Sequence, residues 1–456
     1  MRQAKLIVLV SLFFVFLIFV KLDDSRKQSY TEFLQKNLQQ EVLLEYQINS
    51  SFPITFYHNA YVDHRTNPPR LRIYSLNWCI KKSDFLLVEL FYEGVRTEEK
   101  IKVYGGSLEG PCPSGYGPAK PCFYVAHTFA VIHLGEHRKI NLSVKEIHNP
   151  TDKGITLCLQ PVYYYSQWQN IVLYVEAWRA QGATRFIVFY HSATKQTRRV
   201  LEHYQSLGLI EFRSWPSFGS LPSKIAGRYP RIDDSTFIFS YYLAMNICIL
   251  DIKTTFGSVA DFDEVMVPRN GTMLDYATRE MSGTNVGALS FANNYVSMDP
   301  SIYTSDFSGL TNLSFYAKGG PSKYIFDASV IDVCQVHWVR SFTNKTKKTK
   351  RGDGAVLHLR FNAKNLEKKV SKPFQFFPDN TETHIKNIDE DVKTIFGESP
   401  PVESLEFVNV LNKCVGEKTK GGGKCRSTGG MCKADMDAVY DWVYDKTEGI
   451  FLSGEN

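Results

Sequence analysis

From residue 155 onward, the hydrophobic pattern alternates between segments typical of buried strands and segments typical of amphipathic helices. Strand-like segments lie at 155–160, 185–190 and 209–213, and helix-like segments lie between them at 169–181 and 195–207. Gly182 and Gly208 follow the two helix-like segments, and glycine is common where a helix ends. This alternation predicts a parallel sheet with helices packed on it, so we expect an α/β fold.

An acidic triplet follows a third helix-like segment, 237–254, and a short strand-like segment. Alternation along an extended backbone puts Asp261 and Asp263 on one side and Glu264 on the other. Ligands of open α/β sheets bind at the carboxyl ends of strands, where two carboxylates suit a divalent cation that holds a diphosphate. We therefore predict Asp263 as a direct metal ligand, Asp261 as a partner of a ribose or of the metal through water, and Glu264 as a support of the turn. An isolated triplet of this kind is more often a solvated turn.

Five further residues, which lie later in the sequence, are candidates for the same site. His337 and His358 each follow a strand-like segment, and either imidazole would complete a metal shell. Lys323 and Arg360 are predicted to contact phosphates, and Trp338 to stack on a sugar. For each of them, packing or surface charge is the alternative interpretation.

A transfer from a diphosphate donor to an acceptor hydroxyl would also need a general base, usually a carboxylate. The sequence offers four candidates without choosing among them: Glu280, Asp299, Asp306 and Asp327. No G-x-S-x-G elbow is present, and no G-x-G-x-x-G loop opens the first helix. A hydrolase of that kind and a dinucleotide-binding domain are therefore not predicted.

Residues 6–20 form an unbroken apolar run after Arg2 and Lys5. We predict an uncleaved signal anchor over residues 6–22, with residues 1–5 in the cytosol according to the positive-inside rule. The alternative is a cleaved signal peptide, but no small-residue cleavage site follows the run. Both interpretations place the rest of the chain in a lumen or outside the cell.

Sequons and cysteines agree with that location. Five N-x-[ST] sequons are candidate glycosylation sites: Asn49, Asn141, Asn270, Asn312 and Asn344. The nine cysteines suggest structural disulfides with one cysteine left over. Two local bridges are plausible, one between Cys112 and Cys122 and one within the group of Cys414, Cys425 and Cys432.

The remaining composition divides the chain into regions. Residues 23–50 are predicted as a stem, 51–150 as a small β-sandwich-like domain, 151–361 as the α/β domain, and 362–456 as a helical region with a disulfide-closed tail. The net charge is +6, and part of the basic excess lies in a run at 345–351. We predict that run to be solvated, and we predict no nucleic-acid partner because no recognised module accompanies it.

Several blocks of the sequence, in order, resemble glycosyltransferase family 92. They lie at 158–165, 169–178, 182–191, 200–212, 215–216, 261–268, 322–325, 337–339 and 358–360. The resemblance covers roughly residues 155–361, and an ordered set of blocks is more specific than the acidic triplet alone.

The resemblance implies a GT-A fold, a UDP-sugar donor (typically UDP-galactose), Mn²⁺ or Mg²⁺ as cofactor, and inversion of the sugar. It also implies a single-pass type II protein of the Golgi membrane with a glycan or glycoprotein acceptor, such as fucose on an N-glycan core. The chain has Ile247, Asp327-Ala328 and Leu359 where the family often has Asp, Arg-Pro and Tyr. The alternative is therefore a non-catalytic glycan-binding or scaffold protein on a degenerate transferase fold. The oligomeric state is not predicted.

Overall fold

The structure is a computed structural model of the 456-residue chain. It describes residues 41–48, 56–67, 69–78, 85–92, 95–96, 101–104, 106–107, 123–128, 134–215, 240–297, 306–316, 319–359, 369–370, 374–402, 406–419, 430–446 and 452–453. The expected cytosolic residues 1–5, the expected anchor and residues 23–40 of the expected stem lie outside these ranges, whereas residues 41–48 of the expected stem form a strand of the first sheet. Within them, no helix is long and apolar enough to cross a membrane.

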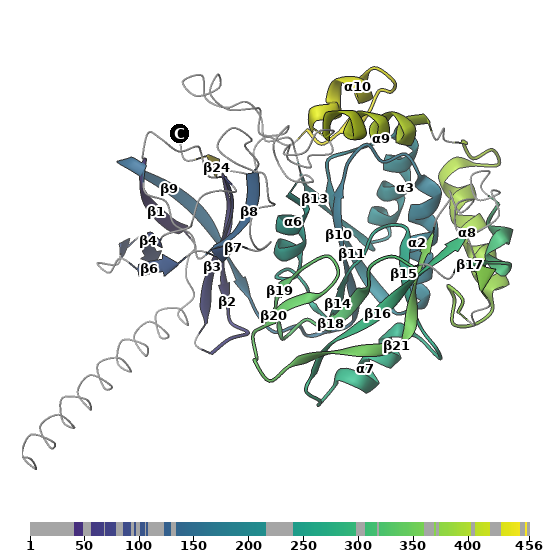
Figure 1. Ribbon diagram of the computed structural model, residues 1–456, viewed down its shortest axis with the longest axis horizontal. Coiled ribbons are helices and arrows are strands. Elements are labelled where there is room, and N and C mark those ends of the chain that lie inside the picture. Colours follow the sequence, from purple (N-terminus) through teal and green to yellow (C-terminus); the bar gives the residue numbers. More distant parts are fainter. Residues whose placement is uncertain are drawn as a thin grey trace, which may run out of the picture.

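The first sheet of the described chain has ten strands, drawn on the left of Figure 1. They are β1 (Glu41–Ile48), β2 (Phe56–Asp63), β3 (Arg70–Trp78), β4 (Phe85–Tyr92), β5 (Val95–Arg96), β6 (Ile101–Tyr104), β7 (Gly106–Ser107), β8 (Phe123–Thr128), β9 (Leu134–Ile147) and β24 (Leu452–Ser453). The long strand β9 pairs antiparallel with β1 and then, from Val144 to Ile147, parallel with β2. The strands expected between residues 51 and 150 are thus present, and their sandwich-like layering stays a prediction.

The second sheet also has ten strands in the described chain. They are β10 (Asp152–Val162), β11 (Ala183–Tyr190), β13 (Ile210–Ser214), β14 (Thr254–Val259), β15 (Glu264–Pro268), β16 (Val286–Ser297), β17 (Ser314–Tyr316), β18 (Lys323–Asp327), β21 (Lys348–Leu359) and β22 (Lys369–Val370). Two short pairs accompany it: β12 (Ser192–Ala193) with β23 (Val443–Tyr444), and β19 (Ile331–Cys334) with β20 (Val339–Phe342). The α/β class expected from the sequence is confirmed.

Four strands of this sheet are parallel, and their order locates the ligand-binding edge. In chain order they are β10, β11, β13 and β14, whereas their order in the sheet is β13-β11-β10-β14. The chain therefore moves outward from β10 in one direction and then returns to its other side. Ligands of open α/β sheets bind at the carboxyl ends of the strands at such a reversal, which here lies between β10 and β14.

Helices cover both faces of the parallel strands (Figure 1). The described helices are α2 (Trp168–Ala180), α3 (Lys195–Ser206), α6 (Tyr241–Cys248), α7 (Met273–Met281), α8 (Thr381–Phe396), α9 (Glu406–Thr419) and α10 (Lys433–Asp437), with short 3-10 turns η3 (Phe307–Thr311) and η5 (Gly430–Cys432). Of these, α2 and α3 lie on one face of the parallel strands and α6 lies on the other. Along β11, Phe186 and Val188 join the core that contains α2 and α3, whereas Ile187 and Phe189 join the core that contains α6. Burial on both faces is the pattern of a parallel strand.

The helix boundaries follow local signals. The helix expected at 169–181 is α2, and Gly182 after it adopts φ +95°, a conformation that favours glycine. A Cβ at Gly182 would also lie 2.4 Å from the Cβ of Leu274. The helix expected at 237–254 is shorter, because α6 ends at Cys248 and β14 begins at Thr254.

The α/β domain extends beyond residue 361, where the sequence pattern placed its end. Ile388, Val392 and Ile395 of α8 are buried in the same core as α2 and α3. The described part of residues 362–456 contains the helices α8, α9 and α10 besides three two-residue strands, but periodicity does not show that α8 completes the main core.

Two disulfides lie in the described chain. Cys414 pairs with Cys432, one of the local bridges left open by the sequence. Cys158 of β10 pairs with Cys248 of α6, which is 90 residues away in sequence. The spacing of the cysteines alone does not indicate this pairing. Cys334 is buried and free, and the remaining cysteines (Cys79, Cys112, Cys122, Cys425) lie outside the described residues.

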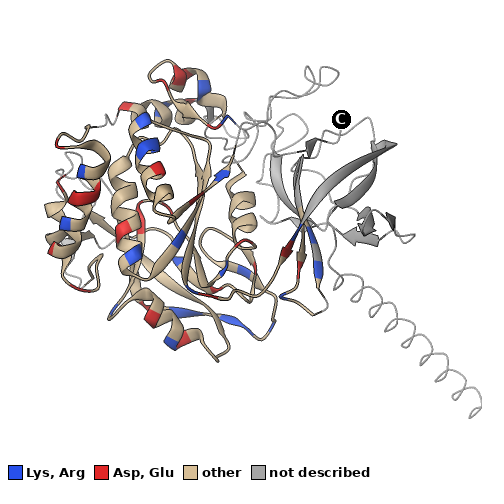
Figure 2. Ribbon diagram, turned by 180° about the vertical axis from the view of Figure 1, so that it is seen from behind, with Lys and Arg blue, Asp and Glu red and all other residues tan. Residues whose placement is uncertain are grey.

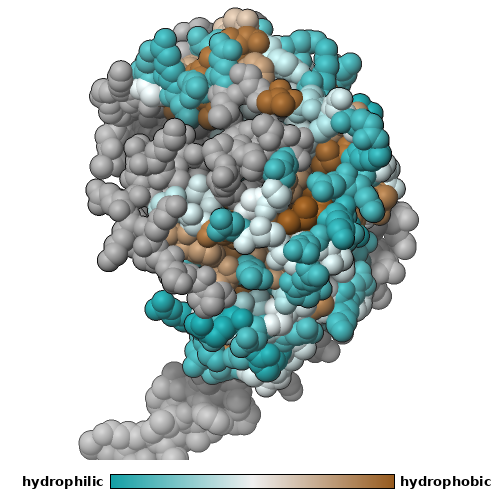
Figure 3. All heavy atoms as spheres, turned by 90° about the vertical axis from the view of Figure 1, so that its right-hand side faces the viewer, coloured by the Kyte–Doolittle hydropathy of each residue, from teal (hydrophilic) through white to brown (hydrophobic). Residues whose placement is uncertain are grey.

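Charged and apolar groups are mixed on the surface. Figure 2 shows basic and acidic residues interspersed over the described helices and strands. The apolar areas on the face in Figure 3 are small and alternate with hydrophilic ones. The basic run at 345–351 is mostly exposed, as expected, but from Lys348 it belongs to β21 and not to a loop.

Candidate active site

The acidic triplet lies in a turn between β14 and β15, and the extended backbone expected from alternation is not found. The backbone N–H of Glu264 donates to the carbonyl of Asp261 at 3.0 Å. Phe262 anchors the turn, since its buried ring packs against Tyr165 and Tyr174 at centroid distances of 5.4 and 5.3 Å. The turn, and not strand alternation, is what directs Asp261 and Asp263 to the same cavity.

Behind the turn lies a buried ion pair between Glu264 and Lys323. The ammonium of Lys323, which is 0% exposed, lies 2.8 Å from Oε2 of Glu264 and 3.1 Å from Oδ2 of Asp261. The sequence predicted Lys323 as a phosphate contact, but the structure commits its charge to these two carboxylates. Glu264 supports the turn as expected, because its Oε2 also accepts from the backbone N–H of Asp261 at 3.3 Å.

Burial and charge act on both partners of this pair. The pKa of Glu264 is raised to about 7, chiefly by burial and then by the charge of Asp261, against the opposing charge of Lys323. Burial lowers the pKa of Lys323, but the carboxylates of Asp261 and Glu264 outweigh it and raise that pKa overall. Lys323 therefore stays charged and fixes the side chain of Asp261 at the rim of the cavity.

His358 connects Glu264 to the second acid of the triplet. Its Nε2 lies 3.0 Å from Oδ2 of Asp263, and its Nδ1 lies 3.3 Å from Oε1 of Glu264. The antiparallel pairing of β15 with β21 places Glu264 opposite His358. The side chain of Asn293 on β16 also reaches Nδ1 at 3.0 Å, and its buried Oδ1 has no hydrogen-bond partner among the described residues.

This arrangement fits a divalent cation. Two atoms bound at right angles to one ion, each at about 2.1 Å, lie about 3.0 Å apart, as Oδ2 of Asp263 and Nε2 of His358 do. A metal-bound histidine usually donates its other N–H to a carboxylate, and Glu264 stands at that place. As placed, the amide nitrogen of Asn293 faces Nδ1 at 3.0 Å and donates to Oε1 of Glu264 at 3.5 Å. A 180° turn of the amide would exchange the hydrogen bond to Glu264 for one in which Oδ1 accepts from the Nδ1–H. Asp263 and His358 are therefore the residues that would hold a metal.

A cavity of about 360 Å³ opens at this pair, a volume typical of small-molecule sites. It lies between the carboxyl end of β10 and the acidic turn, with α9 contributing Val408 and Leu411, and this is the strand-order reversal. Asn170 lines it, with its amide nitrogen 3.1 Å from Oε1 of Gln167 and its buried Oδ1 without a partner in the described chain. The cavity thus combines acids at one side with an amide and tyrosines at the other.

Two other predicted site residues, His337 and Trp338, do not line this cavity. The Nδ1 of His337 faces the carbonyl of Ser322 at 3.1 Å. Burial lowers the pKa of His337, and the nearby charge of Lys323 lowers it further. Trp338 is 58% exposed, so it offers a free ring face to solvent. Arg360 lies outside the described residues.

None of the described general-base candidates lines the cavity. β18 runs antiparallel to β14, so Lys323 lies at the acidic turn while Asp327 pairs with Phe256 at the start of β14. Asp327 instead accepts hydrogen bonds from Ser329. Asp306 caps η3, Glu280 pairs with Lys350, and Asp299 lies outside the described residues. These described candidates therefore lie away from the cavity, and the identity of the general base stays a prediction.

A family comparison covers the elements that build this site. The family model of glycosyltransferase family 92 matches residues 153–396, more than half of the chain, from β10 to the end of α8. The chain belongs to glycosyltransferase family 92. The match includes the acidic turn, Asn293 and His358.

Individual proteins give weaker likenesses. A curated relative, the glycosyltransferase family 92 protein C33H5.2 of Caenorhabditis elegans, is 23% identical over 300 residues, which are 58% of this chain and 57% of the relative. The match thus spans little more than half of the relative's length.

Two solved structures are also similar. Glucosyl-3-phosphoglycerate synthase of Mycobacterium tuberculosis, in complex with Mn²⁺ and UDP-glucose, shows 10% identity, coverage of 53% of this chain and 79% of that chain, and a TM-score of 0.24. The galactosyltransferase LgtC shows 12% identity, coverage of 38% and 58%, and a TM-score of 0.18. These scores carry no argument about the site.

The structure adds site residues that the sequence does not single out. Asn293 supports His358 from β16, and Asn170 and Tyr165 line the cavity from the segment after β10. The block that resembles the family includes Asn170, but an asparagine on a helix gives no signal of its own. Only the fold brings these side chains to the acidic turn.

Proposed function

We propose that this family 92 protein is a metal-dependent, inverting glycosyltransferase that moves galactose from UDP-galactose to a glycan acceptor, such as fucose on an N-glycan core. We also propose that it works in the Golgi membrane as a single-pass type II protein. The observation that most directly supports this proposal is the pairing of Asp263 with His358, which Glu264 supports. This pair lies at a cavity where the strand order reverses.

The residues divide the work of binding the donor. Asp263 and His358 would hold Mn²⁺ or Mg²⁺, which when bound would neutralise charge on the departing diphosphate. Lys323 fixes Asp261 so that its outer oxygen can face a ribose or a metal-bound water. Asn170 lines the same cavity and would bind the nucleoside. The general base would act on the hydroxyl group of the acceptor, and none of the residues that bind the donor is assigned to that role.

None of the departures from the family pattern replaces a member of the metal pair, although Leu359 adjoins it: this residue follows His358, and its backbone N–H donates to the carbonyl of Asp263 at 2.8 Å. Ile247 is buried in the α6 core on the other face of the sheet, and Leu359 is buried beside α2 and β15. Asp327 and Ala328 lie at the opposite end of β18 from Lys323. This supports an active transferase over a non-catalytic glycan-binding protein.

The test is release of UDP from a panel of nucleotide sugars, measured with and without Mn²⁺. We expect the highest rate with UDP-galactose and Mn²⁺, and a loss of about 100-fold or more in Asp263→Asn because charge stabilisation at the reacting bond is lost. Asp306→Asn is the matched control, since it makes the same change at an exposed cap. Metal-independent glycan binding without UDP release, unchanged in Asp263→Asn, would support the non-catalytic protein.

A further inference from the structure

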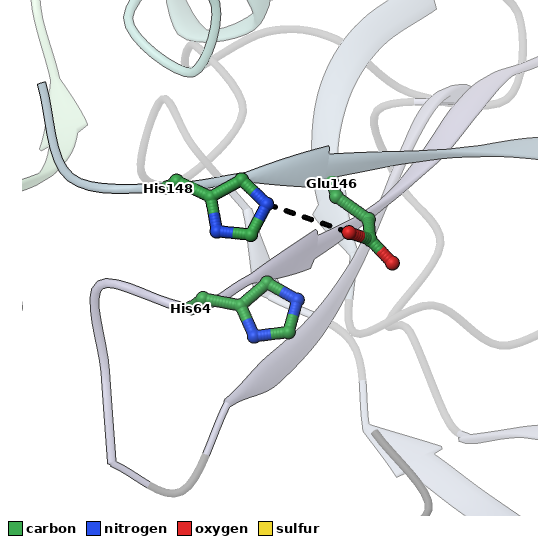
Figure 4. A group of neighbouring side chains, drawn as sticks. All are labelled: His64, Glu146 and His148. Atoms are coloured by element: carbon green, nitrogen blue, oxygen red, sulfur yellow. Dashed lines mark ion pairs between the residues drawn. The ribbon is translucent and has the colours of Figure 1, made fainter. Parts of the chain in front are cut away.

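A second group of metal-ligating side chains lies where the first sheet meets the α/β domain. His64, Glu146 and His148 each offer one ligand atom, and these atoms all lie within 4.8 Å of one another. Figure 4 shows the two imidazoles one above the other, with Glu146 beside them. The group lies before the start of β10, whereas the candidate active site lies at its end. An eleven-residue strand is roughly 30 Å long, so the two sites are separate.

The backbone holds this cluster together. β2 and β9 run parallel, with Asp63 opposite Ile147, and the backbone N–H of His64 donates to the carbonyl of Ile147 at 2.8 Å. Glu146 and His148 flank Ile147, and side chains two apart on an extended backbone share a side. Two segments distant in sequence are thus held together with their three ligands at the ends of β2 and β9.

The ligand atoms are largely free of other described partners. The Nε2 of His64 is buried and makes no hydrogen bond in the described chain. The Nε2 of His148 lies 3.4 Å from Oε2 of Glu146, which is roughly the separation of two tetrahedral ligands bound at about 2.1 Å. An unpartnered buried nitrogen is costly, and a metal ion would satisfy it.

A neighbouring carboxylate is already committed. Both oxygens of Asp63 are occupied, since Nε of Arg65 lies 2.9 Å from Oδ1 and Nη2 of Arg72 lies 2.7 Å from Oδ2. Asp63 therefore does not belong to the cluster, which has two imidazoles and one carboxylate. A cleft of about 530 Å³ borders Glu146 and His148, so an ion and a completing water have access.

We propose that His64, Glu146 and His148 bind one divalent cation of the zinc type, which fastens the turn after β2 to the segment that enters the α/β domain. Imidazole ligands favour Zn²⁺, and the general order of affinities places Zn²⁺ far above Mn²⁺. The near-parallel rings, 4.8 Å apart at an angle of 8°, must turn toward a common point. The side chain of His148 is 65% exposed and has the room to do so.

The test is a zinc titration of the full chain, stripped of metal, in competition with a chromophoric chelator. We expect the Asp263→Asn protein, which lacks the other metal ligand, to bind one Zn²⁺ and to gain thermal stability from it. His148→Ala and Glu146→Gln in the same background should each weaken binding by about 10-fold or more. His384→Ala, at a histidine on α8, is the matched control and should bind as the parent does.

His64→Ala is the variant of the third proposed ligand. Binding of Co²⁺ in place of Zn²⁺ gives a second, spectroscopic measurement of the site. We expect a visible Co²⁺ absorption band in the parent and its loss in His64→Ala and in His148→Ala. Because His148 is exposed, its variant keeps the test valid if the His64 variant fails to fold. The proposal is overturned if no Zn²⁺ binds below about 100 µM, or if His148→Ala binds Zn²⁺ as tightly as the parent.

Discussion

At the scale of single residues, the site depends on a lysine that has no access to solvent. Lys323 neutralises Glu264 and Asp261 from within the protein. Removing one partner of a buried ion pair leaves the other charge uncompensated, which is far more costly than replacing both partners. The acidic turn is therefore stabilised by the same contact that orients it.

Replacement of this lysine tests that account. We expect Lys323→Met to lower the free energy of unfolding by about 3–5 kcal/mol, because two carboxylates lose their counter-charge. Urea denaturation measures it. Lys350→Met, which breaks the exposed pair with Glu280, should leave the denaturation midpoint almost unchanged. Equal midpoints for Lys323→Met and the unaltered protein would show that the buried pair is not needed.

The sequence did not choose between His337 and His358 as the metal ligand, and their positions in the structure distinguish them. His358 contacts Asp263, whereas Nδ1 of His337 faces a backbone carbonyl. We expect His358→Ala to raise the Mn²⁺ concentration for half-maximal UDP release by about 100-fold, and His337→Ala to raise it much less. A titration of activity with Mn²⁺ measures both. The assignment fails if the two variants respond alike, or if only His337→Ala does.

At the scale of elements, the local sequence pattern predicted the boundaries of helices that local interactions determine. The helices after β10 and β11 begin and end within about one residue of expectation, because an amphipathic stripe and a following glycine specify them. The acidic turn was misjudged, since alternation assumes an extended backbone and the packing of Phe262 against Tyr165 and Tyr174 bends it.

Long-range pairing is what the sequence did not reveal. The direction of β18 decides that Lys323, and not Asp327, lies at the acids, and no local pattern gives a strand's direction. The contacts of Glu264 with Lys323 and His358 likewise depend on β15, β18 and β21 meeting in the sheet.

The end of β11 also carries a buried titratable group. Burial lowers the pKa of His191 to about 4, against the smaller opposing effect of Asp445. The histidine is neutral in the folded protein but protonates near pH 6.5 when unfolded. The unfolded state therefore binds more protons between pH 6.5 and 4, and stability falls as the pH is lowered through this window.

The contribution of His191 to the pH dependence of stability can be measured by comparing the unaltered protein with a variant that lacks this histidine. We expect His191 to reduce stability by up to about 1.4 kcal/mol for each pH unit below 6.5. Urea denaturation at pH 7 and pH 5 should show a larger loss for the unaltered protein than for His191→Gln, which cannot titrate. Parallel losses in the two proteins would rule out His191 as the source.

At the scale of the whole molecule, the first sheet and the α/β domain share polar contacts. Arg72 of β3 pairs with Asp332 of β19 at 2.5 Å, and Nη1 of Arg65 donates to the carbonyl of Ala328 at 2.8 Å. Tyr61 and Tyr74 of the first sheet are buried in the core that contains α6. The β-rich region therefore supports the α/β domain directly.

The proposed lumenal location makes a prediction for the whole surface. Asn270, Asn312 and Asn344 are exposed, so a chain exposed to the glycosylation machinery should carry glycans there. We expect glycosidase treatment of protein from eukaryotic cells to increase gel mobility, and each Asn→Gln variant to remove one step. A chain with no glycan at any of the three sites would contradict the lumenal location.

The most direct measurement is the binding of Mn²⁺ by electron paramagnetic resonance, with UDP present. The account predicts that the full chain binds one Mn²⁺ with UDP, and that Asp263→Asn and His358→Ala each lose most of this binding while Asp306→Asn retains it. Binding of Mn²⁺ that is equal in Asp263→Asn and in the unaltered chain would contradict the assignment of the acidic turn as the metal site of the donor.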